Sequence, residues 1–372
     1  MGESRAERLL RSVEGVAYWA AVAPAVACLP AALGYHIARV RGDWDFRYRH
    51  AKRAEVVRNL RQLLGDDLGP DDAELLAQDW FRFASCNAID VMRLRYRAGP
   101  LRRLVEIRGR EHLEAALAGG KGAVVCSAHF GSFDAAFSLL GASGFAVTTI
   151  GRWQHNYTAG LSSAERRFWD LVYARRLRRH RHRPNIEPWG GRVGVAAQAA
   201  AILHANEVVT ISIDAPPLDG DLGRTVDVPF LGRRAGLLPG AVTIAQVTRA
   251  PLLMAFMYRT PDYHHQVLEI SAPVSMAGDT ATAFARCADE VSAAIRRRPA
   301  HWAYWASGGD LARLGVLMTD ADRSPSADPT PTPTPTPTPA PAPAAEPTVE
   351  PTLLADREFA HDGPADNVAA RG

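Results

Sequence analysis

The residue pattern with the most direct chemical meaning is a histidine followed five residues later by an aspartate. His129 and Asp134 come directly after an apolar run at 123–127, with Gly131 between them and helix-forming residues from Ala135 onward. A carboxylate in the first turn of a helix is stabilised by the helix dipole. It can fix the tautomer of an imidazole, so that the other ring nitrogen takes a proton from an attacking hydroxyl or amine. The spacing indicates a general-base pair, and the alternative is a satisfied histidine beside a helix-capping aspartate.

Two further groups of side chains could take part in chemistry. Cys126 and Ser127 are conceivable nucleophiles, but packing is the usual role of such residues inside an apolar strand. The stretch 175–183 contains closely spaced arginines, which favour anionic partners such as lipid headgroups, the phosphates of coenzyme A or an acidic carrier protein. Its candidate phosphate-facing residues are Arg178, Arg179 and Arg181. The alternative is a solvated face, and no nucleic-acid recognition motif accompanies it.

These residues need a framework, and short apolar runs at 123–127, 146–150, 208–213 and 251–256 provide one. Each run is separated from the next by a helix-length segment, which is typical of buried strands in a largely parallel sheet. Helical periodicity between residues 48 and 96 predicts helices that cover this sheet. We expect an α/β fold with a largely parallel sheet flanked by helices, and with its chemistry at the carboxyl ends of the strands.

The two ends of the chain differ from this central part. Residues 15–38 contain no Asp, Glu, Lys or Arg and are long enough for a bilayer. Pro24 and Pro30 argue against an unbroken spanning helix, so the segment is either an apolar membrane anchor or a buried helix. A Thr-Pro repeat near the other end cannot form a core and predicts a disordered tail. The predicted divisions are 1–47 for the membrane-associating segment, 48–321 for the α/β domain and 322–372 for the tail.

Composition excludes several other classes of protein. Of the 372 residues, 47% are hydrophobic and 22% charged, as in an ordinary folded protein. The four cysteines form no C-x-x-C pair, so neither a zinc site nor a disulfide framework is expected, and a reducing compartment is favoured.

Several tryptophans could lie at a membrane interface, line an acyl tunnel or pack in the core, namely Trp153, Trp169, Trp189, Trp302 and Trp305.

Four blocks in a fixed order carry a resemblance to a known superfamily. They are the His-x4-Asp block at 129–134, Gly-Arg-Trp at 151–153, Asp214, and Val-Pro-Phe-Leu-Gly at 228–232. The chain resembles the lysophospholipid acyltransferase superfamily from about residue 10 to residue 305. Within it, the sequence looks most like the branch of the late acyltransferases of lipid A assembly and the phosphatidylinositol mannoside acyltransferases.

The resemblance implies a role for each block. His129 matches the catalytic base and Asp134 its partner, while Arg152 matches an arginine that faces acceptor phosphate or headgroup. Asp214 matches the acidic residue of the third block. Substrate-binding positions are also expected in the fourth block, at Pro229, Phe230 and Gly232. The chain departs from the branch at Ser132, at Ala215 and after Trp305, which leaves the acceptor open.

The function expected from this resemblance is transfer of a fatty acyl group from a thioester to a hydroxyl or amine of a lipid or glycolipid. Acyl-CoA or acyl carrier protein is the donor substrate, and neither a cofactor nor a metal is expected. The expected partners are this donor, the lipid acceptor and a membrane surface, without nucleic acid, at the cytoplasmic face of the plasma membrane. The alternatives are an acyl thioesterase of the same fold and a non-catalytic membrane-binding module.

Overall fold

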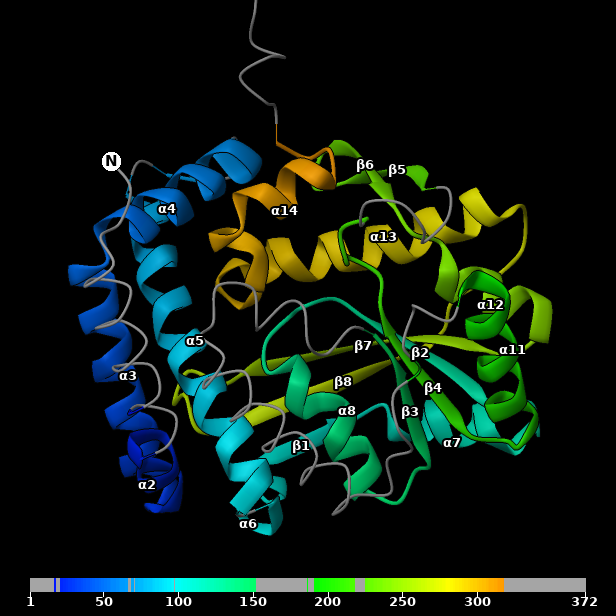
Figure 1. Cartoon of the computed structure of the whole chain (residues 1–372), viewed down its shortest axis with the longest axis horizontal. Helices are drawn as coiled ribbons and strands as arrows, with labels where there is room; N and C mark the ends of the chain where they lie inside the picture. Colours follow the sequence, from blue (N-terminus) through cyan, green and yellow to red (C-terminus); the bar gives the residue numbers. More distant parts are fainter. Residues whose placement is uncertain are drawn as a thin grey trace, which may run out of the picture. The chain divides into compact units, whose positions relative to one another are not determined.

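A six-stranded sheet is the central element of the computed structural model (Figure 1). The structure describes residues 21–65, 71–96, 98–151, 191–217 and 225–317, together with residues 17, 68, 69 and 186. All neighbouring strands are parallel except the antiparallel pair β7–β8, so the predicted α/β class with a largely parallel sheet is confirmed. The order across the sheet is β1 (Val105–Arg108), β8 (Gln266–Pro273), β7 (Leu252–Arg259), β2 (Ala123–Ser127), β4 (Val208–Ser212) and β3 (Val147–Ile150).

Helices cover both faces of the sheet. One face packs against α7 (Arg110–Ala118) and α8 (Phe133–Ala142), and the other against α11 (Gly191–His204), α12 (Gly240–Thr248) and α13 (Thr280–Arg297). Successive side chains of a strand point to opposite faces. Accordingly Val125 belongs to the core on the α7–α8 side, whereas Val124 and Cys126 belong to the larger core on the α11–α13 side. Because both faces are buried, these strands are continuous apolar runs in the sequence.

A helical layer precedes the sheet in the chain. It consists of α2 (Ala23–Cys28), α3 (Ala31–Tyr48), α4 (His50–Leu64), α5 (Asp72–Tyr96) and α6 (Ala98–Arg102). The predicted periodicity of α4 is confirmed, since its apolar positions are buried at Val56, Val57, Leu60, Leu63 and Leu64. Helix α3 lies along α5. It comes so close that a methyl group on Gly42 would be 2.5 Å from the Arg82 Cα.

The predicted anchor at 15–38 overlaps α2 and the beginning of α3. Among the described helices, none combines the length and the apolar composition that crossing a membrane requires. The inner face of α3 is buried at Tyr35 and Ala38, in a small core that α5 shares. Residues 322–372, the predicted tail, lie outside the described residues.

The remaining elements are a hairpin between β4 and α12 and a group of short helices after α13. A hairpin of β5 (Val226–Phe230) and β6 (Arg233–Leu237) packs against α13. After α13 come two short 3-10 helices, η4 (Pro299–His301) and η5 (Ala303–Ala306), and then α14 (Gly308–Arg313). Strands β1, β8, β5 and β6 were not among the four predicted strands. Each lacks a long continuous apolar run, and in β1, for example, half-buried apolar positions alternate with exposed charged ones.

Candidate active site

His129 and Asp214 are brought together by the register of two neighbouring parallel strands. Ser127, the last residue of β2, pairs with Ser212, the last residue of β4. His129 and Asp214 each lie two residues beyond these strand ends. Both side chains therefore emerge at the carboxyl edge of the sheet, which is the place where open α/β sheets bind ligands.

Asp214 binds both the backbone and the ring of His129. The backbone N–H of His129 donates to the two carboxylate oxygens at 3.0 and 2.9 Å, and Nδ1 lies 2.8 Å from Oδ1. The Asp214 side chain is fully buried, whereas 13% of the His129 side chain is exposed. Since an ionised carboxylate can only accept hydrogen bonds, Nδ1 carries the proton. The proton-accepting role therefore falls to Nε2.

Aromatic side chains enclose this pair. The indole Nε1 of Trp302 donates to the second oxygen of Asp214 at 2.9 Å. The rings of Phe133 and Tyr304 lie 4.7 and 4.9 Å from the imidazole of His129, measured between centroids. Such walls keep water away from the buried carboxylate, and hydrogen bonds in a low-dielectric surrounding are electrostatically stronger than in water.

Tyr304 adds a neutral hydroxyl to these surroundings. Burial, followed by the negative charge of Asp214, raises the pKa of this phenol well above its ordinary value. Within the described part of the chain, its hydroxyl is enclosed and has no hydrogen-bond partner. The phenol therefore stays protonated at neutral pH and retains a hydrogen bond to donate.

The turn after β2 depends on Gly131. This residue has φ +60°, and a methyl group in its place would overlap the carbonyl oxygen of Met257 in β7. Its N–H donates to the carbonyl of His301 at 2.8 Å, and Ala303 donates its N–H to the carbonyl of His129 at 2.8 Å. The predicted turn at Gly131 is confirmed, and its backbone is held by hydrogen bonds to the segment from η4 to η5.

Helix α8 begins at Phe133, two residues before the predicted helix-forming run, so Asp134 is its second residue and lies in its first turn. The side chain of Asp134 lies outside the described part, so its pairing with His129 stays a prediction. Four predicted binding residues also lie outside the described residues, namely Arg152, Arg178, Arg179 and Arg181.

The conceivable nucleophiles beside His129 behave as packing residues. Burial, and then the neighbouring Cys287, raise the pKa of the Cys126 thiol well above its ordinary value. The Ser127 hydroxyl is buried and donates to the carbonyl of Ala128 at 3.2 Å. The Cys126 thiol therefore lacks the lowered pKa of an activated nucleophile, and within the described residues the Ser127 hydroxyl is bonded to a carbonyl and not to a base.

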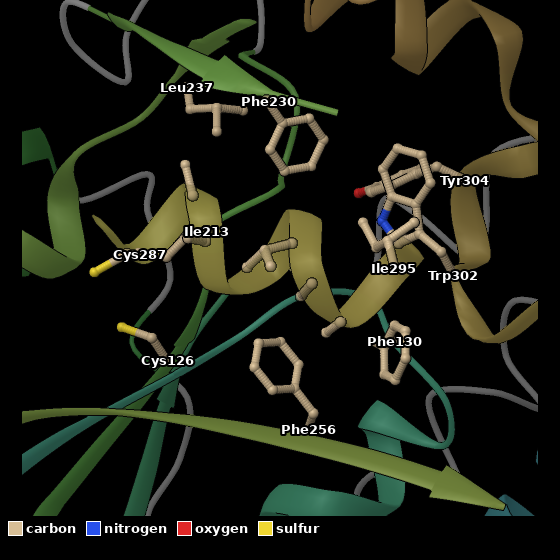
Figure 2. Packing of buried hydrophobic residues seen from close by; sticks show 14 of the residues in the cluster. Cys126, Phe130, Ile213, Phe230, Leu237, Phe256, Cys287, Ile295, Trp302 and Tyr304 are labelled. Atoms are coloured by element: carbon tan, nitrogen blue, oxygen red, sulfur yellow. The ribbon is translucent and has the colours of Figure 1, made fainter. Parts of the chain in front are cut away.

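The Val-Pro-Phe-Leu-Gly block forms the end of β5 and the turn to β6. Phe230 is buried, and its ring lies 5.9 Å from that of Trp302 (Figure 2). Pro229 is exposed, and Gly232 occupies the turn with φ +78°. Through Trp302, the block therefore supports the carboxylate of Asp214. A direct role of Pro229, Phe230 and Gly232 in substrate binding stays a prediction.

The tryptophans near the end of the folded part are core residues. Both Trp302 and Trp305 are fully buried, so of the three roles considered for the tryptophans these two residues have that of core packing. Trp153, Trp169 and Trp189 lie outside the described residues. Sequence reasoning did not identify Trp302 as a donor to Asp214. A partial signal existed for the pairing of Asp214 with His129, because each follows a predicted strand within one or two residues.

One cluster of potential metal ligands occurs within the described ranges, at the β7–β8 turn. Its members are Asp262, His264 and His265, all at least partly exposed. The Asp262 carboxylate accepts the backbone N–H groups of both histidines, each at 3.0 Å. Side chains of Asp commonly bond in this way to the backbone two residues on, so local turn geometry explains the cluster.

Comparison with known proteins gives one family. A family model described as bacterial lipid A biosynthesis acyltransferase matches residues 5–306. This range contains the whole sheet, the His129–Asp214 pair and the segment that encloses it. A comparison with curated proteins finds no match.

Proposed function

The chain belongs to the bacterial lipid A biosynthesis acyltransferase family, and we propose that it moves a fatty acyl group from a thioester to a hydroxyl or amine of a lipid or glycolipid. The donor is acyl-CoA or acyl carrier protein, which share the reacting thioester. The observation that carries the proposal is the bond between Asp214 and Nδ1 of His129, because it leaves Nε2 as the basic nitrogen. A base of this kind is what an acceptor hydroxyl or amine needs in order to attack a thioester.

The proposed reaction has two steps. Nε2 of His129 takes the acceptor proton while the acceptor oxygen or nitrogen forms a bond to the thioester carbon. The tetrahedral intermediate then collapses, the carbon–sulfur bond breaks, and the leaving thiolate receives the proton from the imidazolium. Asp214 holds the ring and stabilises the imidazolium between the two steps. Asp134, at the beginning of α8, is proposed as a second carboxylate acting on the same imidazole.

The decisive experiment uses purified protein with radiolabelled acyl-CoA and a total lipid extract. Wild-type protein is expected to give labelled lipid, and His129→Ala is expected to give almost none while retaining the wild-type circular dichroism. Labelled free fatty acid in place of labelled lipid would identify a thioesterase. No turnover with either acyl-CoA or acyl carrier protein would favour a membrane-binding module. Wild-type activity in His129→Ala would refute the mechanism.

We also propose a membrane surface on α3, at the cytoplasmic face of the plasma membrane. The outer face of this helix carries large apolar side chains at helical spacing, and the exposed fractions are 48% for Leu33, 55% for Val40, 60% for Trp44 and 53% for Tyr48. A helix that presents aromatic and aliphatic side chains outward can bury them in the interface of a bilayer. Such a position would hold the active site close to lipid acceptors.

Vesicle co-sedimentation tests this surface. We expect the double variant Val40→Ser, Trp44→Ser to bind phospholipid vesicles at least about tenfold more weakly, since burying one such side chain contributes roughly 1.5–3 kcal/mol. The matched control is Val247→Ser in α12, because Val247 is 78% exposed and lies on a different helix. Equal weakening by both variants, or by neither, would contradict a membrane surface on α3.

A further inference from the structure

A buried ion pair lies behind the turn that carries His129. Arg259, at the end of β7, pairs with Asp90 of α5, and both side chains are fully buried. The Asp90 carboxylate also accepts from the hydroxyl of Tyr35 and, at 3.2 Å, from Nε2 of Gln266. Arg259 donates to the carbonyl of Tyr263 at 2.9 Å. Because the charges are paired and bonded to further polar groups, their positions are strongly fixed.

Asn87 connects this ion pair to the catalytic turn. Its Oδ1 accepts from Nη2 of Arg259 at 3.1 Å, which fixes the orientation of the side-chain amide. Its Nδ2 then donates to the carbonyl of Gly131 at 2.8 Å. Asn87 lies one helical turn before Asp90, so α5 presents both residues to Arg259. The amide cannot rotate away without losing its bond to a buried cation.

The same network holds the other side of the Gly131 peptide. The backbone N–H of Arg259 donates to Nε2 of His301 at 3.0 Å. Burial, and then the charges of Arg259 and Arg298, lower the pKa of His301 to about 3, so the ring is neutral at physiological pH. The carbonyl of His301 accepts the N–H of Gly131 at 2.8 Å. Both backbone polar groups of Gly131 are therefore held by residues bonded to Arg259.

From this geometry we infer that Asn87 is a positioning residue for acyl transfer. It fixes the peptide between His129 and α8, and through it the angle at which the imidazole faces the acceptor. The inference rests on the proposed function. A displacement of about 1 Å in a reacting group can lower a rate roughly 10²-fold. Loss of the Asn87 bond is therefore expected to act on kcat and to leave donor binding nearly unchanged.

The test compares Asn87→Ala with Gln246→Ala. Gln246, in α12, is a matched control, because its half-buried amide also donates to a backbone carbonyl, that of Met276, at 3.4 Å, and accepts from the hydroxyl of Thr280 at 2.8 Å, on a helix that carries none of the residues of the His129 site. We expect Asn87→Ala to lower kcat about tenfold or more with KM within about twofold, since a misplaced base affects the rate more than binding. Gln246→Ala is expected to lower thermal stability without a selective loss of kcat. Equal kcat values for the two variants would overturn the inference.

Asn87→Asp separates hydrogen bonding from packing. An aspartate has the same shape and can still accept from Arg259, but an ionised carboxylate cannot donate to the Gly131 carbonyl. We expect its kcat to fall at least as far as that of Asn87→Ala. A wild-type kcat in Asn87→Asp would show that the side chain only fills space.

An NMR measurement tests the positioning role of Asn87 independently of turnover. The Nδ1 proton of His129, bonded to Asp214, is expected as a low-field imidazole resonance in the ¹⁵N-edited NMR spectrum. The resonance should broaden or vanish in Asn87→Ala and persist in Gln246→Ala. An unchanged resonance in Asn87→Ala overturns the positioning role even if no donor gives turnover, whereas absent turnover in the wild type counts against the proposed function alone.

Discussion

Replacing Asp214 by asparagine should force the catalytic imidazole into the wrong tautomer. In the wild type, Oδ2 accepts from the Trp302 indole at 2.9 Å, and Oδ1 lies 2.8 Å from Nδ1 of His129. An indole nitrogen can only donate, so the amide oxygen of the new side chain must face Trp302. The amide NH₂ then faces Nδ1, which must become an acceptor. The ring proton consequently moves to Nε2, the nitrogen that should receive the acceptor proton.

The expected magnitude follows from this tautomer change. The equivalent Asp→Asn substitution in the serine-protease triad lowers kcat roughly 10⁴-fold, although the geometry is preserved. At about 1.36 kcal/mol for each tenfold change, this corresponds to about 5.4 kcal/mol of activation free energy. We expect a loss of that order for Asp214→Asn, in steady-state acyl transfer with saturating donor. Circular dichroism should confirm that the fold persists.

Asp134→Asn, measured in the same assay, is the comparison that tests the assignment. We expect a smaller loss, because the bond to Nδ1 is made by Asp214. The exposed Asp227, in β5, supplies a control substitution to asparagine that should leave the rate unchanged. An Asp214→Asn enzyme within about tenfold of wild type would refute the tautomer argument, given the roughly 10⁴-fold loss expected.

Three further outcomes are expected. Gly131→Ala should lower both activity and melting temperature, because a left-handed backbone conformation destabilises a residue with a side chain by roughly 1–2 kcal/mol and the new methyl group would overlap the carbonyl oxygen of Met257. Gly120→Ala, with φ +72° but open space around it, should lose only stability. Thermal melts and rate assays of the pair separate backbone strain from collision with Met257. Truncation after residue 321 should leave melting temperature and specific activity within error, and a large loss would show that the tail docks on the domain. Neutralising the arginine stretch should raise the apparent KM for donor or anionic membrane more than it lowers kcat, with the difference shrinking at high salt. Equal KM values at low salt would identify solvated surface at Arg178, Arg179 and Arg181.

The parts of the fold that the sequence predicted are those with local signals. The strands β2 and β4 are continuous apolar runs, and the predicted ranges agree with the observed strands within one residue. The short strand β1 has two exposed positions among its four, and therefore carries no such signal. The turn at Gly131 was predictable because glycine tolerates positive φ.

The partners of His129 depend on contacts between distant parts of the chain. Asp214 is 85 residues away in sequence and reaches His129 only because β4 pairs with β2. Trp302 donates to Asp214 from a segment after the last long helix. Asn87 belongs to a helix whose periodicity explains its apolar residues but gives no indication of a polar contact to Gly131. Such contacts follow from tertiary packing, which a single sequence does not display.

The two faces of α3 affect how the protein should be modified for work in aqueous buffer. Removing residues 1–38 would delete Tyr35, whose hydroxyl bonds to Asp90, and would leave part of the Arg259–Asp90 pair without its cover. Water entering there would compete for the same donors that orient Asn87. For crystallisation in aqueous buffer, replacing Val40 and Trp44 by serine or glutamate is therefore preferable to truncation, because these substitutions change the outer face and leave the helix in place.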